Sequence, residues 1–113
     1  RIIRQLPACR AKELMFTGNH IAAAEALSIG LVNRVVPKTE VLETALGLAG
    51  EIASKSPLVL ALLKRALRHG ADMPLSAALP FEQAMIGLAL DSNDAHEGCR
   101  AFLEKRSPDF KGN

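Results

Sequence analysis

The chain has 113 residues, enough for one folding unit with a modest hydrophobic core and too few for two conventional domains. Ala and Leu supply most of its 49% apolar share, while Trp and Tyr are absent, so the composition favours helices over a β-sandwich. The 14 Lys and Arg residues are balanced by 12 Asp and Glu along the whole length, which excludes the strong positive field typical of a nucleic-acid-binding protein.

The first third of the chain is predicted to contain two short helices and one strand. A helix is predicted over residues 8–16, where apolar side chains recur three and four positions apart. A second helix fits residues 22–29, and Gly30 can then adopt the positive φ of a helix end. Residues 31–36 are rich in Val and predict a short strand that ends at Pro37.

Three helices are predicted in the middle of the chain. Apolar positions with a period near 3.6 predict the first over about residues 39–53. Ser56 and Pro57 are a typical cap and first helical residue, and the helix that they begin reaches about residue 69. The third covers about residues 75–90. The side chains expected to face the core are Val59, Leu62, Leu63, Ala66 and Leu67 in the second helix and Phe81, Met85, Leu88 and Ala89 in the third.

The charged residues of these helices have structural explanations. Lys64, Arg65 and Arg68 lie near the C-terminal end of their helix, where positive charge complements the helix dipole. No aromatic residues alternate with them, so a solvated face is favoured and RNA binding is the minor alternative. Glu82 is expected on the polar flank of its helix, with a buried ion pair as the alternative.

The positions of the cysteines and histidines argue against a metal site and against disulfide bonds. Cys9 and Cys99 stand alone, and the three His residues are equally dispersed, so neither a zinc site nor a disulfide framework is indicated. The sequence has no uninterrupted run of about 18 apolar residues and no signal-peptide pattern. We therefore expect no metal and no membrane partner, and a reducing compartment: the cytoplasm, or the mitochondrial matrix in a eukaryote.

The last predicted helix begins at Asp94. Asp94 and Glu97 match a D-x-x-E capping pair, which is favoured over acid–base catalysis as their explanation. Gly98 costs about 1 kcal/mol relative to Ala inside a helix, so another group is expected to pack closely against it. Phe102 and Lys105 are three residues apart and are predicted to share one face. A ring beside a mobile cation suits either the edge of a core or a ligand with a ring and a phosphate.

Several motifs occur in a specific order along the chain. They are A-K-E-L-M-F-T-G from Ala11, A-x-E-A-x-x-x-G-L-V-N-x-V-V-P from Ala23 to Pro37, Ser56-Pro57, Lys64, and D-x-x-E-G-x-x-A-F-x-E-K-R-x-P-x-F from Asp94. The ordered set resembles the C-terminal portion of the enoyl-CoA hydratase/isomerase family, also called the crotonase family, over essentially all 113 residues. One departure is Leu6-Pro7, where many members have a glycine, and we expect a local change there without loss of the fold.

The resemblance implies a fold class and a domain organisation. The chain is expected to be mainly α, a helical C-terminal segment of the crotonase fold with one short strand near residues 31–36 and without the N-terminal spiral of ββα units. Residues 1–37 would be the end of the spiral core, and residues 38–113 the helical region through which family members form trimers or dimers of trimers. We expect one folding unit that is a fragment of a longer chain, since the sequence opens with Arg1 and no Met. Alone, it is expected to self-associate, for example by exchanging helices.

The resemblance also implies a ligand contact but no catalytic residue. The family's oxyanion hole and catalytic glutamates lie upstream of the matching region, so the fragment is predicted to be inactive alone. In the family's hydratases, a Phe and a Lys on the final helix border the adenine end of coenzyme A that is bound mainly by a neighbouring subunit. The matching residues are Phe102 and Lys105. A coenzyme A thioester is the expected substrate, with no separate cofactor, and Arg106 and Lys111 are expected to add only diffuse positive charge.

Two classes of function follow. The first hypothesis is that the parent protein is an acyl-CoA enzyme, most simply an enoyl-CoA hydratase that adds water across the 2,3 double bond in fatty-acid or related acyl-CoA metabolism. Another reaction of the family, such as enoyl-CoA isomerisation, is the alternative within that class. The second hypothesis is a non-catalytic helical self-association module, because amphipathic helices without the catalytic half leave apolar surface uncovered.

Overall fold

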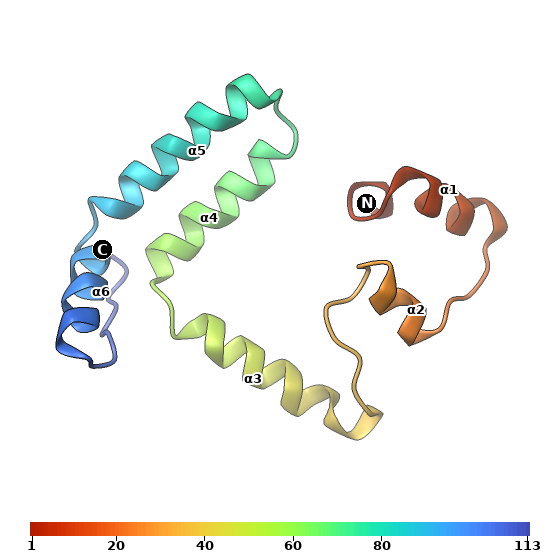
Figure 1. Cartoon of the computed structure of the whole chain (residues 1–113), viewed down its shortest axis with the longest axis horizontal. Coiled ribbons are helices and arrows are strands. Elements are labelled where there is room, and N and C mark those ends of the chain that lie inside the picture. Colours follow the sequence, from red (N-terminus) through yellow and green to blue (C-terminus); the bar gives the residue numbers. More distant parts are fainter. The chain divides into compact units, whose positions relative to one another are not determined.

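The computed structural model describes residues 1–113, and every regular element in it is helical (Figure 1). In chain order the elements are η1 (Ile2–Arg4), α1 (Ala8–Thr17), α2 (Ala23–Ser28), η2 (Lys38–Glu40), α3 (Val41–Ala53), α4 (Pro57–Gly70), α5 (Leu75–Leu90) and α6 (Asn93–Glu104). The mainly helical fold class predicted from the sequence is confirmed. The predicted helices agree with α1 to α6 to within a few residues at each end.

The strand predicted over residues 31–36 is not formed. These residues connect α2 to η2 without regular secondary structure. The N–H groups of Leu31 and Val32 both donate to the carbonyl of Ala26, at 2.9 and 3.4 Å. A strand requires a neighbouring strand to bind its backbone groups, and residues 1–113 contain no other strand. The Val-rich pattern indicates a local preference for extended backbone, but it carries no information about a partner strand.

The chain divides into two compact units, residues 1–45 and residues 46–113, and the boundary falls inside α3. The sequence predicts a division between residues 37 and 38 and a single folding unit. Both stay predictions, because compactness in space does not measure which residues unfold together.

The first unit has a small core around α1. Ala11 of α1 is completely buried, and Leu6 and Ala26 are its other buried apolar side chains. Arg10 of α1 forms an ion pair with Glu25 of α2, which joins the two helices. The small size of these side chains means that little apolar area is buried within this unit.

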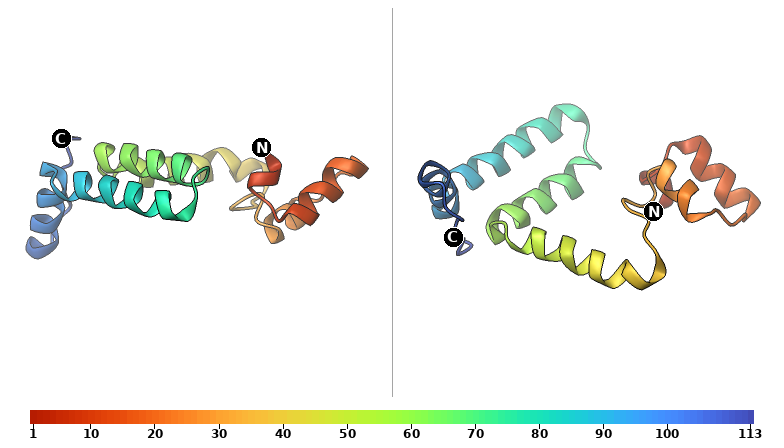
Figure 2. Two further views of the ribbon diagram at one scale, coloured as in Figure 1. Left: turned by 90° about the horizontal axis from the view of Figure 1, so that it is seen from above. Right: turned by 60° about the horizontal axis from the view of Figure 1, so that its bottom comes forward.

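In the second unit, α4 and α5 form a helical hairpin and lie side by side (Figures 1 and 2). Ser56 caps α4 by accepting the N–H of Val59 at 3.1 Å, and Pro57 is the first helical residue, as the sequence predicts. The basic residues Lys64 and Arg65 are exposed on α4, in agreement with a solvated face.

An open apolar groove of about 480 Å³ runs between α4 and α5. Leu62 is buried, but Leu63 and Leu67, which were predicted to face the core, are 50% and 67% exposed. Leu88 is also exposed, because the partly buried stripe of α5 passes beside it. That stripe consists of Ala78, Phe81, Met85 and Ala89.

Glu82 lines the groove, is exposed and makes no ion pair, so the buried ion pair considered for it is excluded.

Candidate functional site

The cysteines, the possible metal ligands and the apolar helices do not indicate a functional site. Cys9 and Cys99 are free and exposed. No group of three or more His, Cys, Asp and Glu side chains is arranged to hold a metal ion. No single helix is long and apolar enough to cross a membrane, and only the bent pair of residues 38–53 and 57–70 reaches that length and composition when taken together. The candidate site is therefore built on α6 and the tail that follows it.

The helix α6 begins one residue earlier than predicted and has a different cap. It starts at Asn93, and the N-cap is Ser92, whose Oγ accepts the N–H of Ala95 at 3.1 Å. The predicted D-x-x-E capping pair of Asp94 and Glu97 is therefore wrong. Because Ser92 already satisfies the helix start, both carboxylates can accept hydrogen bonds from other segments.

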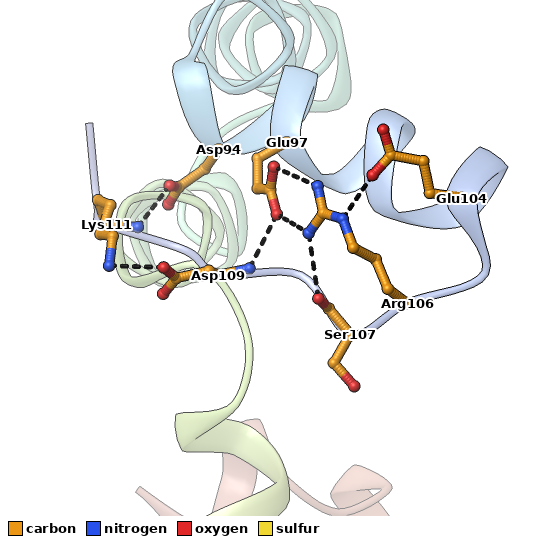
Figure 3. Close-up of polar contacts among 7 residues, drawn as sticks. All are labelled: Asp94, Glu97, Glu104, Arg106, Ser107, Asp109 and Lys111. Atoms are coloured by element: carbon orange, nitrogen blue, oxygen red, sulfur yellow. Dashed lines mark hydrogen bonds and ion pairs between the residues drawn. The ribbon is translucent and has the colours of Figure 1, made fainter.

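Asp94 joins three segments of the second unit, and Figure 3 shows one of these contacts, the hydrogen bond from Lys111 of the tail. Its side chain is buried, with a residue exposure of 2%. Oδ1 accepts the N–H of Lys111 at 2.8 Å, and Oδ2 accepts the N–H of Gly112 at 3.0 Å and the hydroxyl of Ser56 at 2.5 Å. Burial opposes ionisation, but the hydrogen bonds from Ser56, Lys111 and Gly112 outweigh it and lower the pKa of Asp94. One ionised carboxylate thus ties the tail and the start of α4 to the start of α6.

Glu97 makes the second link to the tail (Figure 3). Arg106 donates to it through two nitrogens, Nη1 to Oε1 at 2.5 Å and Nη2 to Oε2 at 3.0 Å, and the Asp109 N–H donates to Oε1 at 3.0 Å. These hydrogen bonds, Arg106 first, lower the pKa of Glu97 to about 2. Arg106 Nε also donates to Glu104 at 2.6 Å, and the two carboxylates raise the pKa of Arg106.

Arg106 and Lys111 are not sources of diffuse positive charge, which corrects the prediction for both. Arg106 is paired with Glu97, and Lys111 Nζ lies 2.7 Å from a carboxylate oxygen of Asp109 (Figure 3). Each positive charge is compensated locally, so neither contributes much to a long-range field.

The ring of Phe110 packs beside Gly98, but not so closely that the position requires glycine. A Cβ atom added at Gly98 would lie 3.6 Å from Phe110 Cε1. That separation is an ordinary van der Waals distance, so the ring rests on the helix backbone but leaves room for a methyl group. The contact holds the returning tail against α6.

Phe102 and Lys105 are exposed at the C-terminal end of α6. Phe102 is in the last turn of the helix and is 81% exposed. Lys105 follows the last helical residue, is exposed and makes no ion pair. The prediction that both residues share one helical face does not hold, because Lys105 has left the helix and helical spacing no longer applies to it.

The backbone of Lys105 is in the left-handed conformation, with φ 55° and ψ 38°. It is the only residue other than glycine with a positive φ in the chain. The Lys105 N–H donates to the Phe102 carbonyl at 3.3 Å, and the Arg106 N–H donates to the Ala101 carbonyl at 3.0 Å, the two bonds of a Schellman motif. Glycine is the usual residue at this place, and α1 indeed ends with Gly18 at φ 65°. A lysine here carries a conformational cost that glycine would avoid.

The end of α6 therefore presents an aromatic ring and an unpaired ammonium group to solvent. Such groups can stack on a flat ring and attract an anion. The sequence pattern did not predict a partner for Arg106, because Glu97 is nine residues earlier, outside helical spacing. The E-K-R motif contained Arg106, but only the folded tail shows what it binds.

Comparisons with known proteins agree over the whole chain. A sequence model of the family described as enoyl-CoA hydratase/isomerase matches residues 1–113. The chain is 42% identical over 112 residues to 2,3-dehydroadipyl-CoA hydratase of Escherichia coli K12, covering 99% of this chain and 44% of that protein. It is also 42% identical over 112 residues to the enoyl-CoA hydratase EchA19 of Mycobacterium tuberculosis, covering 98% of this chain and 42% of that protein.

The fold is similar to that of solved structures. The crystal structure of the enoyl-CoA hydratase from Bacillus anthracis matches with a TM-score of 0.95 and 38% sequence identity, covering 99% of this chain and 43% of that one. The chain thus spans less than half the length of the relatives that it matches.

Proposed function

Because the chain belongs to the enoyl-CoA hydratase/isomerase family, we propose that it is the helical C-terminal segment of an enoyl-CoA hydratase, an enzyme that adds water across the 2,3 double bond of enoyl-CoA thioesters. The observation that carries the proposal is the family match over residues 1–113 together with two hydratases at 42% identity. The coenzyme A thioester is the substrate and no separate cofactor takes part. The enzyme acts in the cytoplasm, or in the mitochondrial matrix in a eukaryote.

Within that enzyme, the contribution of this segment to substrate binding is the border formed by Phe102 and Lys105 at the adenine end of coenzyme A. Two observations support it. The Phe102 ring is almost fully exposed, so its faces are accessible to a ligand. Lys105 also occupies a backbone conformation that favours glycine, and backbone outliers of this kind cluster at binding and active sites.

The second contribution of the segment is oligomerisation, as trimers or dimers of trimers. The apolar groove between α4 and α5 and the exposed leucines at its rim, Leu63 and Leu67, support this role. Apolar surface of this kind is normally covered by protein. The same observation favours the alternative in which residues 1–113 serve only as a helical association module without chemistry.

Enzyme assays on the full-length protein discriminate between these functions. We expect the reading frame that encodes Arg1 to continue upstream, and the full-length protein to convert a 2-enoyl-CoA thioester into the 3-hydroxyacyl-CoA, measured as loss of the enoyl absorbance. Residues 1–113 alone serve as the control and are expected to show no turnover, because the family's oxyanion hole lies outside the matched segment. A stop codon or an unrelated domain immediately upstream would leave only the association module. Migration of the double bond without water addition would make the protein an isomerase.

The coenzyme A border is tested by Phe102→Ala and Lys105→Ala in the full-length protein. Removing a ring that stacks on a base costs roughly 1–3 kcal/mol, so Phe102→Ala is expected to weaken coenzyme A binding about tenfold. Lys105→Ala removes one partly screened ionic contact and is expected to weaken binding about fivefold. Calorimetry measures both affinities, and sedimentation should show an unchanged oligomer.

The matched controls are Leu103→Ala and Arg100→Ala, which remove an exposed apolar side chain and an exposed cation from the same helix. Both controls are expected to keep the affinity of the parent protein. Unchanged affinity in Phe102→Ala and Lys105→Ala alike would remove the assignment of this border.

A further inference from the structure

Arg106, the residue directly after Lys105, is anchored through both its backbone and its side chain. Its N–H donates to the carbonyl of Ala101 at 3.0 Å. Its guanidinium binds both oxygens of Glu97, one oxygen of Glu104 and the carbonyl of Ser107, the last at 3.2 Å (Figure 3). A planar guanidinium held at this many points fixes its direction far better than a single ionic contact does.

Glu97 extends this anchoring along the tail. Besides binding Arg106, it accepts the N–H of Asp109 at 3.0 Å. The chain from residue 106 to residue 109 is therefore held against α6 by a single carboxylate (Figure 3). Lys105 lies between a regular helix on one side and this anchored segment on the other. An unfavourable backbone conformation persists only where its surroundings impose it in this way.

The same contacts shape the charge around Lys105. Glu104 precedes it directly, and an unpaired carboxylate there would repel an anionic ligand. Arg106 Nε binds Glu104 at 2.6 Å, so this carboxylate already has a cationic partner. Arg106 shares its single charge with Glu97, so the three groups together stay net negative. Lys105 is left with no ion pair of its own, so its ammonium group is available to a ligand.

We propose that Arg106 and Glu97 are positioning residues for Lys105: their two-point ion pair holds the left-handed turn at the end of α6 so that the Lys105 ammonium group is presented to the phosphates of coenzyme A. This inference rests on the proposed coenzyme A contact of Lys105. Arg106 thereby has a structural role that a diffuse positive charge at the same place could not perform. The ion pair with Glu97 fixes the orientation of the turn, and its charge alone would not do so.

A double-mutant cycle in the full-length protein tests the inference, with the dissociation constant of coenzyme A measured by calorimetry. Glu97→Gln keeps an acceptor for the Asp109 N–H but removes the charge that holds Arg106. Glu97→Gln is expected to weaken binding about threefold in the parent protein, an effect of the size found between coupled neighbouring residues. In a Lys105→Ala background the same substitution is expected to have no effect, because no ammonium group remains to be positioned.

Arg106→Lys and Arg106→Ala provide the conservative comparison. Lysine keeps the charge but not the planar fork, so Arg106→Lys should retain more affinity than Arg106→Ala and less than the parent protein. Glu13→Gln is the matched control, since Glu13 pairs with Arg10 in the first unit and the change removes the same kind of charge. It is expected to leave the affinity unchanged.

The outcomes separate this inference from the proposed function. Equal losses from Glu97→Gln in the parent protein and in Lys105→Ala would show a general structural effect and overturn the inference. An effect of Lys105→Ala without any effect of Glu97→Gln would also overturn it while leaving the coenzyme A border in place. No effect of Lys105→Ala would remove the coenzyme A contact of Lys105 and the positioning role with it, and would leave the contact of Phe102 to its own variant.

Discussion

Asp94→Ala is expected to destabilise the protein strongly, lowering the Tm of the full-length protein by about 5–10 °C. The substitution removes an acceptor that three donors share: the Ser56 hydroxyl and the N–H groups of Lys111 and Gly112. Those donors lie around a buried site, where a polar group left without a partner is costly. The start of α4, the start of α6 and the tail would lose their common link together.

Graded and control variants make the Asp94 result specific. Asp94→Asn keeps the shape and part of the acceptor capacity, so its Tm should fall between those of the parent protein and Asp94→Ala. Asp91→Ala removes an exposed acid three residues earlier and should change the Tm little. Differential scanning calorimetry of all three variants gives the comparison. Equal stability of Asp94→Ala and Asp91→Ala would mean that the link through Asp94 does not contribute in the full-length protein.

Lys105→Gly is expected to be the opposite case, a substitution that stabilises the protein while it weakens ligand binding. Glycine adopts the left-handed conformation at φ 55° without the Cβ clash, so Lys105→Gly should be more stable than Lys105→Ala by about 1 kcal/mol. Both variants lose the ammonium group, and both should bind coenzyme A about fivefold more weakly than the parent protein. Stability and binding would then place different demands on the same residue.

Chemical denaturation and calorimetry of the two variants measure the two effects separately. Comparing Gly with Ala at position 105 isolates the backbone conformation, because the loss of positive charge near the helix C-terminus is the same in both. The left-handed turn is contradicted if Lys105→Ala is as stable as Lys105→Gly. The functional explanation of the lysine is contradicted if Lys105→Gly is more stable and binds coenzyme A as tightly as the parent protein.

The strand at residues 31–36 and the caps at Ser56 and Ser92 show which predictions from sequence succeed. Ser56 and Pro57 begin α4 as predicted, because a cap and a first helical residue act on backbone groups within three positions. The strand prediction is wrong because a strand needs a second strand to pair with, and the residues of one strand do not show whether a second exists. At α6, two good capping residues competed: Ser92 became the cap, and Asp94 was left for the tail.

The sequence predicted the two exposed residues of the candidate site but not the ion pair beside them. The sequence indicated Phe102 and Lys105 through the resemblance of their motif, and the structure places both exposed at one end of α6. The helical spacing that seemed to join them ends before Lys105. The pairing of Arg106 with Glu97 brings together residues nine positions apart through a tail that turns back on its own helix. No local pattern describes such a contact.

The sequence by itself determined the helices, most of their ends and the family, because these depend on interactions between residues close in the chain and on an ordered set of motifs. Only the tertiary structure decided which residue caps α6, how the tail is bound and why Lys105 is held in a left-handed turn. These features depend on which donors reach a given carboxylate once the chain has folded. Asp94 binds residues 38 positions before it and 18 positions after it, and at those separations folding, not sequence spacing, chooses the partner.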